Sequence, residues 1–287
     1  MNSLIDILRP DFLLHHAVYG SLVVGFVCPL VGAYFLLRRL VFWGVALPQV
    51  SAAGIACALM LQGLGVVPLS GVGRERYLAI VGSIIFTVGA ILLLVVMDQR
   101  GRGVSEGRVG AIYAVATAAA ILFLVSNPAG EVEMLGLLKG EIISISEDDF
   151  HLILDLFGLI GVCMLLFQKE FMLVSYDQEL AVTLGRNVIG WNIVLYGLVG
   201  LAISLGVMTV GPLVIFGFLL IPPMIALPWA RGMMSFSLVA SAAGGISAVG
   251  GFYLSYHRDL PLGPVMVSVA VCLLLLSTAL RAIASRV

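Results

Sequence analysis

The sequence predicts an all-α membrane protein, a polytopic helical bundle of about nine transmembrane helices. Hydrophobic residues make up 61% of the 287 positions and charged residues only 11%, whereas about a quarter of a soluble domain is charged. The mean hydropathy is +1.14, and apolar runs of roughly 20 residues, the length that crosses a bilayer, recur along the chain. The links between these runs are short, so we expect a single transmembrane domain over residues 1–287.

Nine apolar runs account for the nine expected spans, and each is long enough, or nearly so, to cross the hydrocarbon. Pro48 lies in the second run, and Pro222 and Pro223 lie in the seventh, so these two helices are expected to be kinked or interrupted. The nine runs cover residues 13–37, 44–65, 77–97, 109–126, 150–168, 189–208, 210–228, 235–256 and 262–281.

The basic residues predict an N-terminus outside the membrane and a C-terminus inside. Short cytoplasmic loops retain Lys and Arg, and this orientation places ten of the 15 basic residues inside. The inner residues are Arg38, Arg39, Arg100, Arg102, Arg108, Lys169, Arg186, Arg231, Arg281 and Arg286. The outer residues are Arg9, Arg74, Arg76, Lys139 and Arg258.

Several kinds of chemistry have no support in the sequence. It contains no GxxxxGK[ST] loop to bind phosphates, so if ATP drives transport, another subunit hydrolyses it. It also contains no GxGxxG, no HExxH and no convincing nucleophile-base-acid set, so we expect neither enzymatic activity nor a resident cofactor. The net charge of −1 and the absence of a Lys/Arg-rich stretch argue against nucleic-acid binding.

A polar segment on the predicted cytoplasmic side, residues 169–187, contains the signals of a short helix. Ser175 and Asp177 are candidate N-caps, and Gly185 is a candidate C-cap, for a helix over about residues 175–187. Such a helix either docks into a groove on a cytoplasmic partner or rests on the lipid headgroups. One side of it would carry Leu180, Ala181 and Leu184.

Five segments together resemble the permeases of metal-ion ABC uptake transporters, the importers of zinc, manganese and iron. Residues 176–185, YDQELAVTLG, are similar to that family's coupling-helix motif FDPELARALG. The other four segments occur in the family's order. They are LRRLVFWGVALPQVSAAGIA (37–56), LGLLKGEIISISEDD (135–149), VGPLVIFGFLLIPPMIA (210–226) and LSYHRDLPLGPVMV (254–267).

The resemblance implies the permease subunit of an ATP-binding-cassette importer in the inner (plasma) membrane. Its implied partners are ABC ATPase subunits, an external solute-binding protein and a second permease copy, either identical or a paralogue. The cargo would be a divalent cation that passes between the two copies. The residues implied to couple the permease to the ATPase are Tyr176, Asp177, Glu179, Leu180 and Gly185.

One departure from the family pattern lies in the first of these four segments, at residues 44–50. Where the family has Gly-Asp-Ala-Leu-Ser-His-Ala, this chain has Val45 in place of the Asp and Gln49 in place of the His. Neither position can supply a carboxylate or an imidazole ligand. A metal chelate or another small solute therefore stays open as the cargo.

Four polar residues near the expected outer ends of spans are the candidate metal ligands. His151 and Asp155 are four residues apart and share a helix face, and a carboxylate inside an apolar span is costly without a partner or water. His257 and Asp259 would lie at the outer mouth, although Asp259 is an equally good cap for the last helix. Weaker candidates are His15, His16 and Glu141.

A carrier driven by an ion gradient, without ATPases, is the competing class of function. Such carriers often contain inverted internal repeats, and the sequence shows no convincing one.

Overall fold

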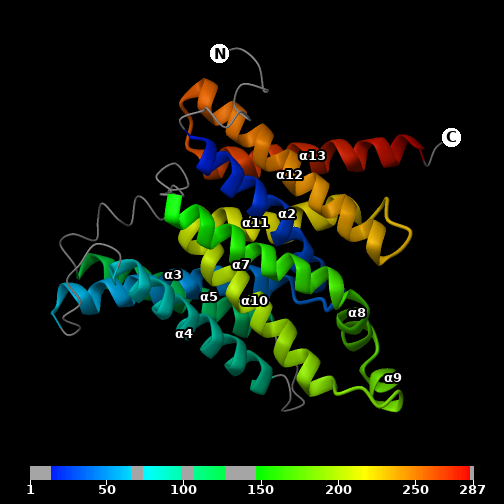
Figure 1. Cartoon of the computed structure of the whole chain (residues 1–287), viewed down its shortest axis with the longest axis horizontal. Coiled ribbons are helices and arrows are strands. Elements are labelled where there is room, and N and C mark those ends of the chain that lie inside the picture. Colours follow the sequence, from blue (N-terminus) through cyan, green and yellow to red (C-terminus); the bar gives the residue numbers. More distant parts are fainter. Residues whose placement is uncertain (1–13, 66–73, 98–105, 127–146, 285–287) are drawn as a thin grey trace.

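The computed structural model describes residues 14–65, 74–97, 106–126 and 147–284, and the elements within these ranges are all helical. Figure 1 shows the helices as a bundle. They are α2 (His15–Leu37), α3 (Val41–Gly63), α4 (Arg74–Met97), α5 (Glu106–Val125), α7 (Glu147–Leu166), α8 (Gln168–Tyr176), α9 (Gln178–Thr183), α10 (Val188–Val210), α11 (Pro212–Ala226), α12 (Met233–Arg258) and α13 (Leu262–Ala284).

Fewer of the described helices than the predicted nine are long and apolar enough to cross a membrane by themselves. Seven of the described helices are long and apolar enough to cross a membrane, and the bent pair α7 and α8 would make eight. Each of the nine predicted runs forms a helix, but α11 has only 15 residues. At 1.5 Å per residue it covers about 22 Å, less than the hydrocarbon core of about 30 Å.

The prolines do not interrupt their helices, which rules out one of the two expected outcomes. Pro48 lies within the continuous helix α3, and Pro222 and Pro223 lie within α11. A proline removes one backbone hydrogen bond, and neighbouring helices and local adjustment accommodate that loss in a membrane bundle. The sharp change of direction comes instead at Phe167, where α7 and α8 meet at 66°.

Helix α2 is the centre of the bundle, and α7, α11 and α12 pack around it. Most of its side chains are buried. Its contact with α12 is close because Gly25 and Gly244 face each other, and a Cβ atom on Gly244 would collide with the carbonyl oxygen of Gly25. Small residues allow helix backbones to approach in this way.

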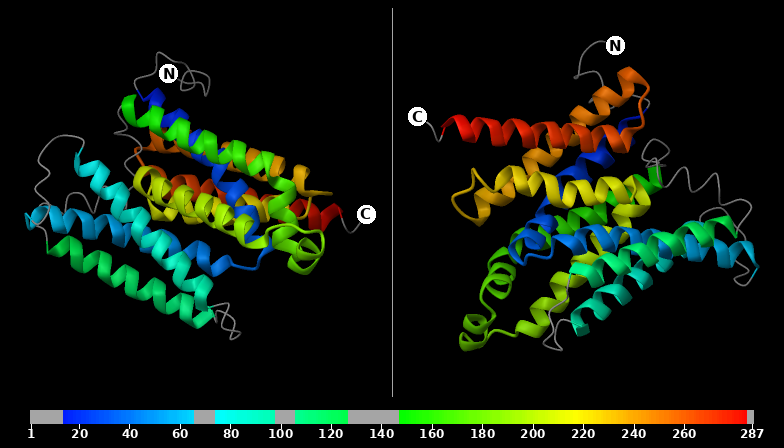
Figure 2. Two further views of the ribbon diagram at one scale, coloured as in Figure 1. Left: turned by 60° about the horizontal axis from the view of Figure 1, so that its bottom comes forward. Right: turned by 180° about the vertical axis from the view of Figure 1, so that it is seen from behind.

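Helices α3, α4 and α5 pack together beside this central group. They lie on one side of the molecule, with α12 and α13 on the other and α10 between them (Figure 2). Large apolar side chains are exposed on α4, α5 and α13, as expected for surfaces that lipid or another membrane protein covers.

Candidate functional site

Helix α9 is the short polar helix predicted from the sequence, and both of its ends are closed by specific hydrogen bonds. At its start, Oδ1 of Asp177 accepts a hydrogen bond of 2.9 Å from the backbone N–H of Leu180. At its end, Gly185 has a φ of 70°, and its N–H donates to the carbonyl of Val182. The N–H of Arg186 donates to the carbonyl of Ala181, which completes a Schellman motif. The predicted caps Asp177 and Gly185 are confirmed.

The alternative N-cap, Ser175, is wrong, because this residue lies inside α8. The predicted helix over residues 175–187 therefore contains the last residues of α8 and the whole of α9, with Asp177 between them. The hydroxyl of Ser175 accepts a hydrogen bond from Arg38 instead of capping α9.

Among the apolar side chains of α9 and its flanking residues, one is buried and the others are exposed. Ala181 is completely buried, whereas Tyr176 is 83% exposed and Leu184 is 60% exposed. The predicted grouping of Leu180, Ala181 and Leu184 is thus only partly correct, since Ala181 faces the protein. We call the exposed apolar residues Tyr176, Leu180, Val182 and Leu184 the α9 surface.

An ion pair connects the end of α9 to α8. Nη2 of Arg186 lies 3.3 Å from Oε1 of Glu170. The Glu179 side chain is exposed in the first turn of α9, where a negative charge stabilises the N-terminus of a helix. The short helix is therefore positioned by its own caps and by α8.

His151 and Asp155 lie on one exposed face of α7, as the spacing predicts. Asp155 is about 12 Å along the helix from its first residue. Further along the same face, Leu159 and Val162 are exposed. A carboxylate among apolar side chains at this depth is costly against lipid, so this face is better suited to water or to another protein.

His257 and Asp259 lie at the end of α12. Nδ1 of His257 is 3.1 Å from the carbonyl oxygen of Tyr253, and the two rings are 4.3 Å apart. Asp259 follows the last helical residue in a left-handed conformation, with a φ of 48°. Since α13 begins at Leu262, Asp259 ends α12 and does not occupy the cap position of the last helix.

The predicted metal ligands do not converge within one copy of the chain. Among the described residues, no group of three or more His, Cys, Asp or Glu side chains is placed to hold a metal ion. The rings of His16 and His151 both lie beside Phe150, at 5.2 and 5.8 Å, and the ring of His15 is 3.9 Å from that of His16. Glu141 lies outside the described residues.

Val45 and Gln49 are one turn apart in α3 and are both partly exposed. Most of the neighbouring residues of this helix are buried. The two positions at which the chain departs from the family pattern therefore face the same open side of α3.

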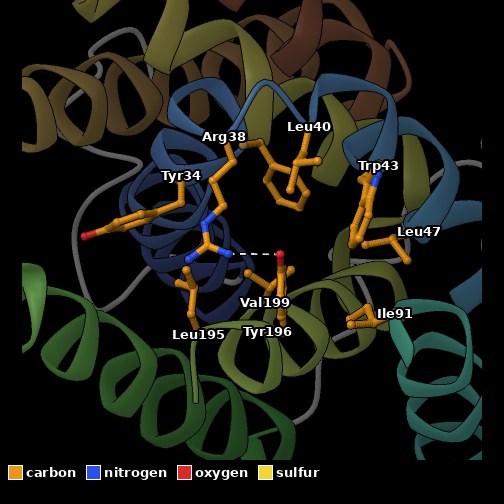
Figure 3. A pocket seen from close by; sticks show the side chains of 10 residues that line it. Tyr34, Arg38, Leu40, Trp43, Leu47, Ile91, Leu195, Tyr196 and Val199 are labelled. Carbon is orange, nitrogen blue, oxygen red and sulfur yellow. Dashed lines mark hydrogen bonds between the residues drawn. The ribbon is translucent and has the colours of Figure 1, made fainter. Parts of the chain in front are cut away.

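Arg38 is the residue that sequence reasoning missed, because it was considered only as a loop charge. It lies at the end of α2 and lines a small cavity together with Tyr34, Trp43 and Tyr196 (Figure 3). Its partners are more than 130 positions away in the sequence, so no local spacing pattern indicates them.

Comparison with known proteins places this architecture among transporters. The sequence profile of the ABC 3 transport family matches residues 11–281. The zinc transport system membrane protein TroC of Treponema pallidum is 27% identical over 272 residues, with 93% of this chain and 88% of that protein covered. The manganese transport system membrane protein MntC of Listeria innocua is 25% identical, with 90% and 86% covered.

The fold also matches a solved structure. The structure of PsaBC from Streptococcus pneumoniae in complex with Fab superposes with a TM-score of 0.80 at 22% sequence identity. The match covers 96% of this chain and 94% of the other.

Proposed function

Because the chain belongs to the ABC 3 transport family, we propose that it is the transmembrane permease of an ATP-binding-cassette importer for zinc, manganese or iron. The family match over residues 11–281 is the observation that carries this proposal. Relatives that cover nine-tenths of the chain are named as zinc and manganese transport membrane proteins. The seven apolar helices agree with a protein embedded in the membrane.

In this proposal the permease conducts the cargo and separate ATPase subunits hydrolyse ATP. The α9 surface is the contact for those subunits. Its exposed tyrosine, at the end of α8, and its exposed aliphatic side chains, on and directly after α9, suit insertion into a groove on a partner. Beside this surface, Asp177 and Glu179 would supply charged contacts to the ATPase, and Gly185 would supply a backbone contact.

The orientation that fits this contact has nine crossings of the inner (plasma) membrane, with the N-terminus outside and the C-terminus inside. Helix α9 then faces the cytoplasm after the fifth crossing. The short helix α11 counts as a crossing. Because its side chains are largely buried by protein, lipid does not have to match its length at every point.

The cargo pathway runs between two permease copies, with a solute-binding protein delivering the cargo at the outer face. The exposure of Asp155 and His151 supports this location of the pathway, because a second copy or water has to cover the face of α7 on which they lie. His257 and Asp259, both exposed at the end of α12, would lie at the outer mouth. Pairing of two copies supplies the ligands that one copy does not bring together.

A second cargo class, a metal chelate or another small solute, is favoured by one observation. Val45 and Gln49 offer an aliphatic side chain and a neutral amide on the open side of α3. A bare divalent cation is held better by carboxylate and imidazole ligands. The same permease architecture with a less charged pathway would suit a cargo that arrives with its own ligands.

Uptake by reconstituted vesicles tests the proposal. The permease, its ATPase and its solute-binding protein should accumulate zinc, manganese or iron only when ATP is present. A parallel assay with metal chelates distinguishes the two cargo classes. Accumulation driven by an ion gradient without the ATPase would refute the importer and favour a secondary carrier.

A further inference from the structure

The turn after α2 fixes the starting point of the Arg38 side chain. Arg38 is the C-cap of α2, and Arg39 follows with a left-handed φ of 56°. The N–H of Leu40 donates to the carbonyl of Phe35, and the N–H of Arg39 donates to that of Leu36. This Schellman motif joins α2 to α3 without a flexible loop, so the backbone of Arg38 is held in one place.

The guanidinium of Arg38 joins three helices through three hydrogen bonds. Nε donates to Oγ of Ser175 in α8 at 2.9 Å. Nη2 donates to Oδ1 of Asn192 at 2.7 Å, and Nη1 donates to the hydroxyl of Tyr196 at 2.9 Å, both in α10. The carbon at the centre of the guanidinium also lies 5.1 Å from the centroid of the Tyr196 ring, within the range of a cation–π contact.

These bonds depend on the planar shape of an arginine. Asn192 and Tyr196 are four residues apart and so share a face of α10, while Ser175 approaches from the other helix. A guanidinium presents its donors in a rigid fork that fixes the angle between such acceptors, whereas a lysine ammonium acts as a flexible point charge. All three acceptors are neutral, so the arrangement is directional hydrogen bonding and not a simple ion pair.

The other end of α8 is also attached to the bundle. Nε2 of Gln168 donates to Oγ of Ser237 in α12 at 2.8 Å. Phe171 is completely buried, and its ring lies 5.9 Å from that of Tyr34 and 5.7 Å from that of Trp191. Helix α8 is therefore held near its start by α2, α10 and α12, and near its end by Arg38.

We propose that Arg38 is a positioning residue that carries displacement of α9 into α2 and α10. This inference rests on the proposed function, in which the ATPase moves α9. The mechanical link from α9 to α8 consists of the short joint at Asp177 and the ion pair of Arg186 with Glu170. From the end of α8, the Arg38 fork transmits the displacement to α2, the central helix of the bundle, and to α10.

The test compares Arg38→Gln with Arg39→Gln in the complete transporter, with the ATPase and the solute-binding protein present. Each variant removes one positive charge from the same turn, but Arg39 is exposed and is not part of the fork. The readout is the number of metal ions imported per ATP hydrolysed, together with the amount of ATPase that co-purifies. We expect Arg38→Gln to lower ions per ATP at least fivefold with ATPase retained, and Arg39→Gln to stay within twofold of the wild type.

Three further variants protect the test against simple misfolding. Asn192→Ala and Tyr196→Phe each remove one acceptor and leave the arginine in place, and each should lower ions per ATP by a smaller factor. Arg38→Lys, which keeps the charge and loses the fork, should resemble Arg38→Gln. A normal ratio in the acceptor variants and in a folded Arg38 variant would overturn this inference alone. Absence of ATP-dependent uptake by the wild type would instead overturn the proposed function.

Discussion

Asp155 is the residue of α7 that is most costly to place in a membrane, because its carboxylate needs water or a polar partner. It is exposed on a face that continues through Leu159 and Val162. Ionisable side chains within membrane spans almost always face a bundle interior or a water-filled cavity. In the proposed dimer, Asp155 faces the pathway, where it attracts the cation and is itself hydrated.

Replacement of Asp155 by Asn tests this role. Loss of the charge should reduce metal import at least tenfold, because a neutral amide is a poorer ligand for a divalent cation than a carboxylate. Asp155→Glu, which keeps the charge, should retain more of the import. Zinc, manganese and iron uptake measured in the same vesicles checks the prediction, and unchanged uptake of all three metals would remove Asp155 from the pathway.

Residues whose structural role depends on near neighbours could be predicted from sequence, and those with distant partners could not. Asp177 and Gly185 cap α9 through bonds to residues within four positions, so local preferences were sufficient. Arg38 meets Ser175, which is 137 positions away. Nothing in the spacing along one helix indicates such a contact, because it arises only when three helices pack.

At the scale of an element, α9 owes its shape to its two ends, since six residues are too few to form a stable helix alone. Helix α8 is an element that periodicity does not indicate. The sequence pattern places residues 169–176 in a polar segment, but residues 168–176 form α8, with Gln168, Phe171 and Val174 buried. The break at Phe167 comes from packing of α8 against other helices and has no proline or glycine signal.

Removal of the α9 cap should weaken the contact with the ATPase. Asp177→Ala leaves the N–H of Leu180 without its acceptor, which costs about 1 kcal/mol of helix stability. Less ATPase should therefore co-purify with the permease. Asp177→Ser keeps a capping oxygen without the charge, so normal co-purification of this variant would assign the effect to the cap, and loss would assign it to a direct charge contact.

The crossing of α2 and α12 should not tolerate a side chain at Gly244. A Cβ there would collide with the backbone oxygen of Gly25, and overpacking of this kind costs about 1–3 kcal/mol. Gly244→Ala should therefore lower the unfolding temperature of the detergent-solubilised protein. Gly89→Ala is the matched control, because no atom lies within 4 Å of the added Cβ, and its unfolding temperature should not fall.

At the scale of the whole molecule, the all-helical class followed from composition. Hydropathy located every described helix that is long and apolar enough to span a membrane, but it could not show that α11 would be only 15 residues long. The pairing of copies that we propose depends on which helix faces the folded chain leaves exposed. Spacing predicted that His151 and Asp155 share a face of α7, but only the folded chain shows that this face is exposed.

The orientation of the whole molecule can be tested by labelling. A single cysteine at Val182, which is exposed, should react with a membrane-impermeant thiol reagent only when the cytoplasmic side is accessible. The four native cysteines, which are free, are first replaced by alanine. A cysteine introduced at the exposed Leu260 should show the opposite pattern, and reaction of residue 182 from outside would mean that α9 cannot reach an ATPase.

The hydrogen bonds that close both ends of α9 are contained in residues 177–186. The exposed side chains of this segment can therefore change without loss of the bonds that close its ends, provided that the buried Ala181 is kept. In the proposed importer, exchange of this stretch for that of a relative would change which ATPase the permease binds and leave the other helices of the bundle unchanged.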